Sequence, residues 1–112
     1  MSKNFKLYIK LILEAIIEIE SFTENLTYED FIKNMMAIKA VSMDLLLIGE
    51  NVKLVPAEIK QQHSQIPWTR MKSARNLIAH DYLKVELKDL WDTAKCELPP
   101  LKAILQKILE NE

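Results

Sequence analysis

Glycine is almost absent from this sequence, since one glycine and four prolines occur in 112 residues. Glycine usually makes up about 7% of a chain and supplies many of the tight turns that join the strands of a sheet. A sheet-rich fold is therefore excluded, and long helices are expected. We predict an all-α fold, an antiparallel bundle of four or five helices that forms a single domain over residues 1–112.

Cysteine is also scarce, because Cys96 is the only one and the chain has just two histidines. A lone cysteine makes no internal disulfide, and no Cys/His cluster has metal-ligand spacing, so we predict a reducing compartment, no metal and no cofactor. The first ten residues carry Lys3, Lys6 and Lys10 and lack the apolar core of a signal peptide. No uncharged apolar run approaches the ~20 residues that span a bilayer, so we expect a cytoplasmic protein without membrane contact.

The formal net charge is only −1, which argues against a protein that holds nucleic acid through overall charge. The charges are nevertheless segregated along the chain. Residues 14–30 contain six acids and no Lys or Arg, whereas residues 53–88 contain seven bases and three acids. Such runs are usually solvated faces, so the segregation alone assigns no function.

The first helix is predicted from Lys6 onward, because polar residues recur every four positions as far as Glu18. Most of the intervening residues are Leu, Ile or Ala, so this helix is apolar around most of its circumference. In so small a domain, such a helix needs either a central place in the bundle or a second apolar surface. We favour a homodimer interface over a purely intramolecular core.

Turn and cap signals place the remaining helices. Thr27 and Asp30 have the spacing of a capping box, which predicts a second helix from there to Ile48. Gly49 either ends that helix or permits a close helix crossing.

Prolines mark the second half of the chain. Pro67 suits the first turn of a third major helix, which follows an irregular segment where we expect His63 to lie in solvent. A last helix begins near Leu87 and is expected to bend or break at Pro99-Pro100.

The stretch "ARNLIAHDY", residues 74–82, places Arg75, Asn76, His80 and Tyr82 within nine residues. At 100° per residue, Asn76 and His80 are stacked neighbours four residues apart. Tyr82 falls near Arg75 if the helix continues, and the four side chains then line one groove.

Arginine and histidine together are the minimum for cleaving an RNA phosphodiester without a metal. Arginine offers a charged fork that matches phosphate oxygens, and histidine transfers protons near pH 7. In that reaction the ribose 2′-hydroxyl attacks the adjacent phosphorus. An arginine near a helix end more often forms a surface salt bridge, and on spacing alone that alternative stays open.

The motif of Arg75, Asn76, His80 and Tyr82 resembles the signature of the HEPN superfamily, and specifically of HepT-like toxins. "IGEN" (48–51), "IPW" (66–68) and "LWDTAKCELPPL" (90–101) extend the resemblance over essentially the whole chain. It implies an all-helical homodimeric bundle of HEPN type that acts as a metal-independent endoribonuclease. Such proteins are the toxins of toxin–antitoxin pairs, and the antitoxin is a small nucleotidyltransferase of the MntA type.

The resemblance also implies a role for each residue of the motif. Arg75 and His80 of both protomers would form a composite catalytic cleft at the two-fold axis, with Asn76 as polar support. Tyr82 would accept AMP that the antitoxin transfers from ATP, which neutralises the toxin. An alternative from another class is a non-catalytic helical binding module that partners a nucleotidyltransferase, and a plain dimerisation bundle is a third.

Overall fold

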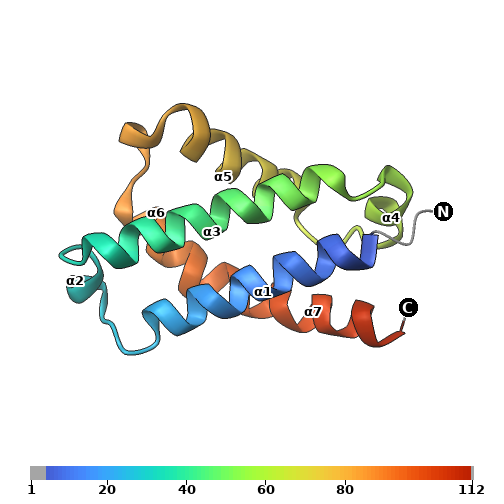
Figure 1. Ribbon diagram of the computed structural model, residues 1–112, viewed down its shortest axis with the longest axis horizontal. Helices are drawn as coiled ribbons and strands as arrows, with labels where there is room; N and C mark the ends of the chain where they lie inside the picture. The colour runs from blue at the N-terminus through green and yellow to red at the C-terminus, as the bar shows by residue number, and fades with distance from the viewer. Residues whose placement is uncertain (1–4, 112) are drawn as a thin grey trace.

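Four long helices dominate the computed structural model, which describes residues 5–111 (Figure 1). No strand occurs in that range, so the predicted all-α fold is confirmed. The long helices are α1 (Phe5–Thr23), α3 (Met35–Leu54), α5 (Trp68–His80) and α7 (Leu98–Asn111). The shorter elements are α2 (Tyr28–Phe31), α4 (Ala57–Gln62), the 3₁₀ turn η1 (Tyr82–Lys84), α6 (Leu87–Asp92) and the π-helical segment η2 (Thr93–Glu97).

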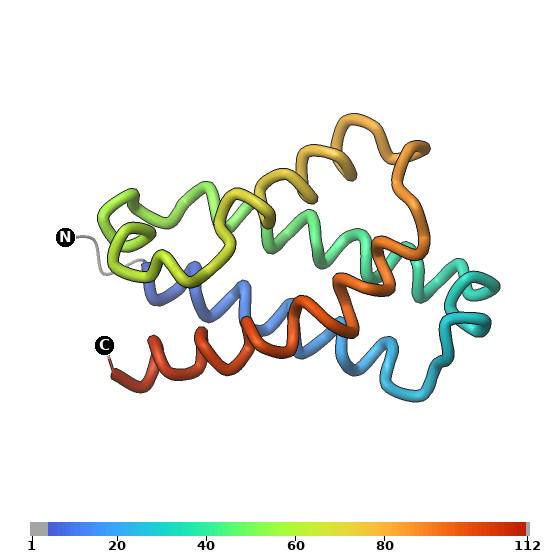
Figure 2. Tube along the Cα trace, turned by 180° about the vertical axis from the view of Figure 1, so that it is seen from behind, coloured from blue at the N-terminus to red at the C-terminus, as the bar shows by residue number. Residues whose placement is uncertain are grey.

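Helix α3 lies between α1 and α5, and it runs antiparallel to both (Figure 1). Seen from behind, α6, η2 and α7 form one nearly continuous rod that crosses the back of the molecule (Figure 2). Helix α7 packs along α1 from that side. The expected antiparallel bundle is therefore present, and α3 and α5 are the pair that carry the motif of interest.

The core is built mainly from one side of α1 and the facing sides of α3 and α7. On α1 the side chains of Ile9, Ile12, Ile16 and Ile19 are fully buried, as the apolar periodicity requires. Burying each such side chain contributes about 1.5–3 kcal/mol before the cost of chain ordering. Other apolar residues of the same helix, Leu7, Leu11, Ile17 and Phe22, remain exposed in the single chain.

The predicted capping box is present, but the helix that it starts is much shorter than expected. The backbone N–H of Asp30 donates to Thr27 Oγ1 over 3.1 Å, and the N–H of Thr27 donates to Asp30 Oδ2 over 3.0 Å. Helix α2 then ends at Phe31, and α3 begins afresh after Asn34, whose Oδ1 accepts the N–H of Ala37. The prediction of one continuous helix was wrong because an asparagine side chain favours a cap over a helix interior.

The last helical segment was predicted to bend or break at Pro99-Pro100, and the chain in fact stays helical through this pair, so no break occurs. Pro99 and Pro100 lack the N–H groups that would continue a regular hydrogen-bond ladder. The chain instead widens into a π-helical turn, in which the N–H of Leu98 donates to the carbonyl of Thr93. Both prolines then fall in the first turn of α7, where the missing donors cost little.

His63 is less exposed than predicted. It ends α4, and its carbonyl accepts a hydrogen bond from the indole Nε1 of Trp68 over 3.1 Å. Its Nε2 is buried and has no hydrogen-bond partner within the described residues. The expectation of a solvated histidine was wrong because Trp68 packs back over the loop. Within residues 5–111, none of the helices is long and apolar enough to cross a membrane.

Candidate active site

Helix α5 carries the motif and packs mainly against α3. Among its 13 residues only Met71 is buried. The two helices cross at Gly49 of α3, where a β-carbon would overlap the Cβ of Arg75. The absence of a side chain at residue 49 therefore allows α5 to approach α3 closely enough to bring Arg75 over it.

Arg75 is fixed by polar groups on both helices. Its Nε–H donates to Glu50 Oε1 over 2.5 Å, and its Nη2 lies 2.5 Å from the same oxygen. Its Nη1 donates to Asn76 Oδ1 over 3.0 Å. The side chain of Arg75 is only 18% exposed, compared with 42% for that of Glu50.

Within the part of the chain that the structure describes, these contacts leave part of the guanidinium free to bind an anion. The group has five N–H donors, and Glu50 and Asn76 engage three of them, counting the ion-pair contact of Nη2. Of the other two N–H groups, one is on each terminal nitrogen, the pair that forms a fork toward a phosphate. Arg75 is thus a cation whose position is fixed by Glu50 and Asn76 and whose two remaining N–H groups can bind an anion.

His80 is the last residue of α5 and is exposed. The helix ends there because Asp81 leaves the helical conformation, while its N–H still donates to the carbonyl of Leu77 over 2.8 Å. Five residues along a helix are ~7.5 Å of rise and ~140° of rotation apart. Arg75 and His80 of one chain therefore flank a shared surface and do not project side by side.

Tyr82 lies outside the helix, so the angular position that assumed a continuing helix does not apply. It opens the 3₁₀ turn η1, and its hydroxyl lies 3.4 Å from Ser42 Oγ on α3. Ser42 already donates to the carbonyl of Ile38 over 2.8 Å, so Tyr82 is the donor in their contact. The ring is partly exposed and is tethered to α3.

The structure therefore groups the predicted residues in part. Arg75 and Asn76 touch, His80 follows at the helix end, and Tyr82 is turned toward α3. Sequence reasoning did not assign roles to Glu50 or Ser42, the residues of α3 that contact Arg75 and Tyr82. The signal for Glu50 was available in the "IGEN" stretch, where the glycine and the acid are adjacent.

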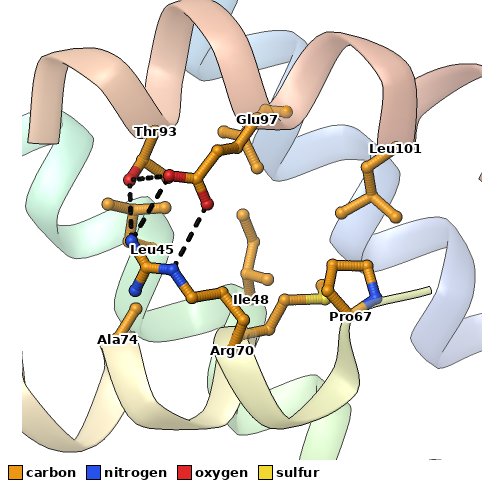
Figure 3. Close-up of a pocket in the computed structure, with 10 residues that line it drawn as sticks. Leu45, Ile48, Pro67, Arg70, Ala74, Thr93, Glu97 and Leu101 are labelled. Atoms are coloured by element: carbon orange, nitrogen blue, oxygen red, sulfur yellow. Dashed lines mark hydrogen bonds and ion pairs between the residues drawn. The ribbon is translucent and has the colours of Figure 1, made fainter. Parts of the chain in front are cut away.

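A second arginine of α5, Arg70, makes a comparable but more exposed ion pair on another side of the helix (Figure 3). Its Nε lies 3.3 Å from Glu97 Oε1, and its Nη2 lies 3.4 Å from Thr93 Oγ1. Together they border a cavity of about 30 Å³, lined mostly by apolar residues, between α5 and η2. That volume is about one water molecule, so the cavity is a packing gap and not a substrate site.

The opposite side of α3 holds a buried acid. Asp44 is only 4% exposed, and one of its carboxyl oxygens has no hydrogen-bond partner among the described residues. Burial, together with the neighbouring carboxyl of Glu18 on α1, raises the pKa of Asp44 to about 7. Within residues 5–111, no three His, Cys, Asp or Glu side chains are grouped to hold a metal ion.

Comparisons with known proteins agree on one family. The model of the family described as Ribonuclease HepT-like matches residues 12–108. A Methanocaldococcus jannaschii protein named "Putative RNase MJ1216" is 35% identical over 97% of this chain and 90% of its own. A Thermococcus cleftensis protein named "Probable ribonuclease HepT" is 37% identical over 96% of this chain and 98% of its own. No solved structure matches significantly. The chain belongs to the Ribonuclease HepT-like family.

Proposed function

We propose that this protein is a metal-independent endoribonuclease, the toxin of a toxin–antitoxin pair, with Arg75 and His80 as its catalytic residues. The observation that carries the proposal is the guanidinium of Arg75, which is fixed by Glu50 and Asn76 and keeps donors open on the same helix that ends at the exposed His80. The names of the relatives as ribonucleases support RNA as the substrate.

The proposed chemistry needs only these side chains and the RNA. His80 accepts the proton of a ribose 2′-hydroxyl while the 2′-oxygen forms a bond to the adjacent phosphorus. The bond from phosphorus to the 5′-oxygen breaks, and that oxygen takes a proton from a protonated histidine. Arg75 donates to the phosphate oxygens that gain charge in the transition state. The products are a 2′,3′-cyclic phosphate and a 5′-hydroxyl end.

A second copy of the chain would supply what one copy lacks. A single His80 has to act first as base and then as acid, whereas two copies provide one histidine for each task. A row of exposed apolar residues supports this arrangement, since Met36, Met43, Leu47 and Leu54 fall within about 40° of one another on α3. We call these four residues the α3 stripe. It runs beside Glu50, so pairing of two copies through it brings the two Arg75 sites together.

Control by a nucleotidyltransferase antitoxin of the MntA type completes the proposal. The enzyme would transfer AMP from ATP to the hydroxyl of Tyr82, which releases pyrophosphate. Tyr82 is partly exposed on η1, and within residues 5–111 its hydroxyl is held by one long contact, to Ser42. An added nucleotide phosphate beside Arg75 and His80 would compete with RNA for the same cations.

The experiment that tests the activity uses purified protein whose intact mass shows an unmodified Tyr82. Incubation with single-stranded RNA in excess chelator is expected to yield fragments with cyclic phosphate ends. If the unmodified, folded protein leaves RNA intact, the alternative of a non-catalytic binding partner for a nucleotidyltransferase is favoured instead.

A further inference from the structure

We propose that Glu50 is a positioning residue that orients Arg75 for phosphate binding. The inference rests on the proposed function, because it gives Glu50 a role in the same reaction. Glu50 touches no reacting atom in this account and acts only through the arginine.

The geometry of the contact selects this role. A single oxygen, Oε1 of Glu50, meets both Nε and Nη2 of Arg75 at 2.5 Å. These two contacts hold the edge of the guanidinium formed by Nε and Nη2, so they fix the orientation of the guanidinium plane. The donors left over are on the two terminal nitrogens, and they are directed away from Glu50.

Glu50 lies in α3 at the point where α3 and α5 cross. The Cβ of Arg75 lies directly against Gly49, the residue that precedes Glu50. The carboxylate of Glu50 and the guanidinium of Arg75 therefore meet within one turn of the helix crossing. The other cation near Glu50 is Lys53, whose Nζ lies at 4.0 Å in an exposed pair. Exposed pairs of that kind contribute little, so the carboxylate of Glu50 is engaged mainly by Arg75.

Two replacements of Glu50 separate positioning from direct catalysis. Glu50→Gln retains an oxygen where Oε1 lies, and an amide oxygen accepts both N–H groups. Glu50→Ala removes both contacts and leaves the contact with Asn76 to hold the guanidinium, so the arginine can rotate about that contact. We expect Glu50→Gln to keep kcat/KM within about threefold of the wild type, and Glu50→Ala to lose on the order of 10–100-fold. A general base at residue 50 would be inactivated equally by both changes.

The double variant is the sharper test. If Glu50 acts through Arg75, its removal has no further effect once the arginine is absent, so Arg75→Ala/Glu50→Ala should match Arg75→Ala alone. A double variant at least tenfold slower than Arg75→Ala would overturn the inference. Lys53→Met serves as the matched control, because it removes the other cation of Glu50 and should leave kcat/KM unchanged.

A second measurement does not depend on cleavage. In ¹⁵N NMR spectra the Nε–H of Arg75 should be protected from solvent exchange in the wild type and in Glu50→Gln, and should exchange at least tenfold faster in Glu50→Ala. Unchanged protection in Glu50→Ala would overturn the positioning role even if Arg75 is essential. A wild type that cleaves no RNA would refute the proposed function, while this readout still reports on the contact itself.

Discussion

Gly49 and Arg75 meet where α3 and α5 cross, so closely that a β-carbon on residue 49 would overlap the Cβ of the arginine. Glycine to alanine inside a helix normally stabilises it by roughly 1 kcal/mol. Here we expect the opposite sign, because the nearest obstacles are the arginine Cβ and the α5 backbone. Gly49→Ala should lower the free energy of unfolding by about 1–3 kcal/mol in denaturant titrations.

The same substitution should be checked in a second background. Arg75→Ala retains the Cβ, so it should not rescue Gly49→Ala. A Gly49→Ala variant more stable than the wild type would show that the two helices are further apart than described here.

The α3 stripe, and not the exposed apolar side of α1 that the sequence pattern favoured, is expected to be the centre of the homodimer interface. Leu47→Glu should place a charge in that interface and weaken the dimer by about 100-fold or more, as measured by light scattering at decreasing concentration. RNA cleavage should fall with the dimer fraction.

Ile17→Glu is the matched control for that experiment, because Ile17 and Leu47 are both 44% exposed. Ile17 is three residues before Glu20, whose carboxylate pairs with Lys102 of α7 at 2.8 Å, so it faces the α7 side of α1. Dissociation by Ile17→Glu but not by Leu47→Glu would place the interface elsewhere.

Asp44 should make the protein less stable as the pH rises toward 7. The unfolded chain releases this proton near pH 4, whereas the raised pKa of about 7 retains it in the folded state. The folded state thus binds more protons between these values, and the stability that the acid contributes is full below pH 4 and lost as the pH passes 7.

Asp44→Asn should remove that dependence, since its amide N–H donates to Glu18 as the protonated acid does. We expect its Tm at pH 8 to exceed that of the wild type by roughly 5 °C or more. The exposed Asp89→Asn is the control and should follow the wild type. Parallel Tm profiles for Asp44→Asn and the wild type from pH 5 to 8 would contradict the assignment.

Tyr82→Phe should separate catalysis from control. Among the described residues, the hydroxyl makes the single 3.4 Å contact to Ser42, so its loss is expected to change RNA cleavage by less than about threefold. On coexpression with the proposed nucleotidyltransferase antitoxin, the wild type should gain AMP in the intact mass, and Tyr82→Phe should not. Tyr28→Phe is the control, and AMP that persists on Tyr82→Phe would locate the acceptor elsewhere.

The helical fold was predictable because its causes are local. One glycine, the apolar periodicity of α1 and the Thr27–Asp30 cap each act within a few residues. The errors occurred where neighbouring signals compete. Asn34 offers a cap in the middle of an apolar stretch, and the Pro99-Pro100 pair is absorbed by a π turn, which residue preferences alone do not specify.

The site was predictable only as a list of residues. Spacing on one helix gave the neighbours Asn76 and His80, but the partner of Arg75 is 25 residues away on another helix. The contact of Tyr82 with Ser42 spans 40 residues and depends on where α5 ends. Contacts between residues so far apart in the chain depend on how α3 and α5 cross at Gly49. The periodicity of a single helix does not predict them.

The central claim is that Arg75 and His80 carry out metal-independent RNA cleavage. Its most direct test is the rate of cleavage in chelator by Arg75→Ala, His80→Ala and Arg70→Ala, each checked for folding by circular dichroism. We expect losses on the order of 10²–10³-fold for the first two variants. Arg70→Ala, which removes an arginine of the same helix that pairs with Glu97, should keep the wild-type rate. Wild-type rates in both Arg75→Ala and His80→Ala would show that these two residues do not catalyse the cleavage.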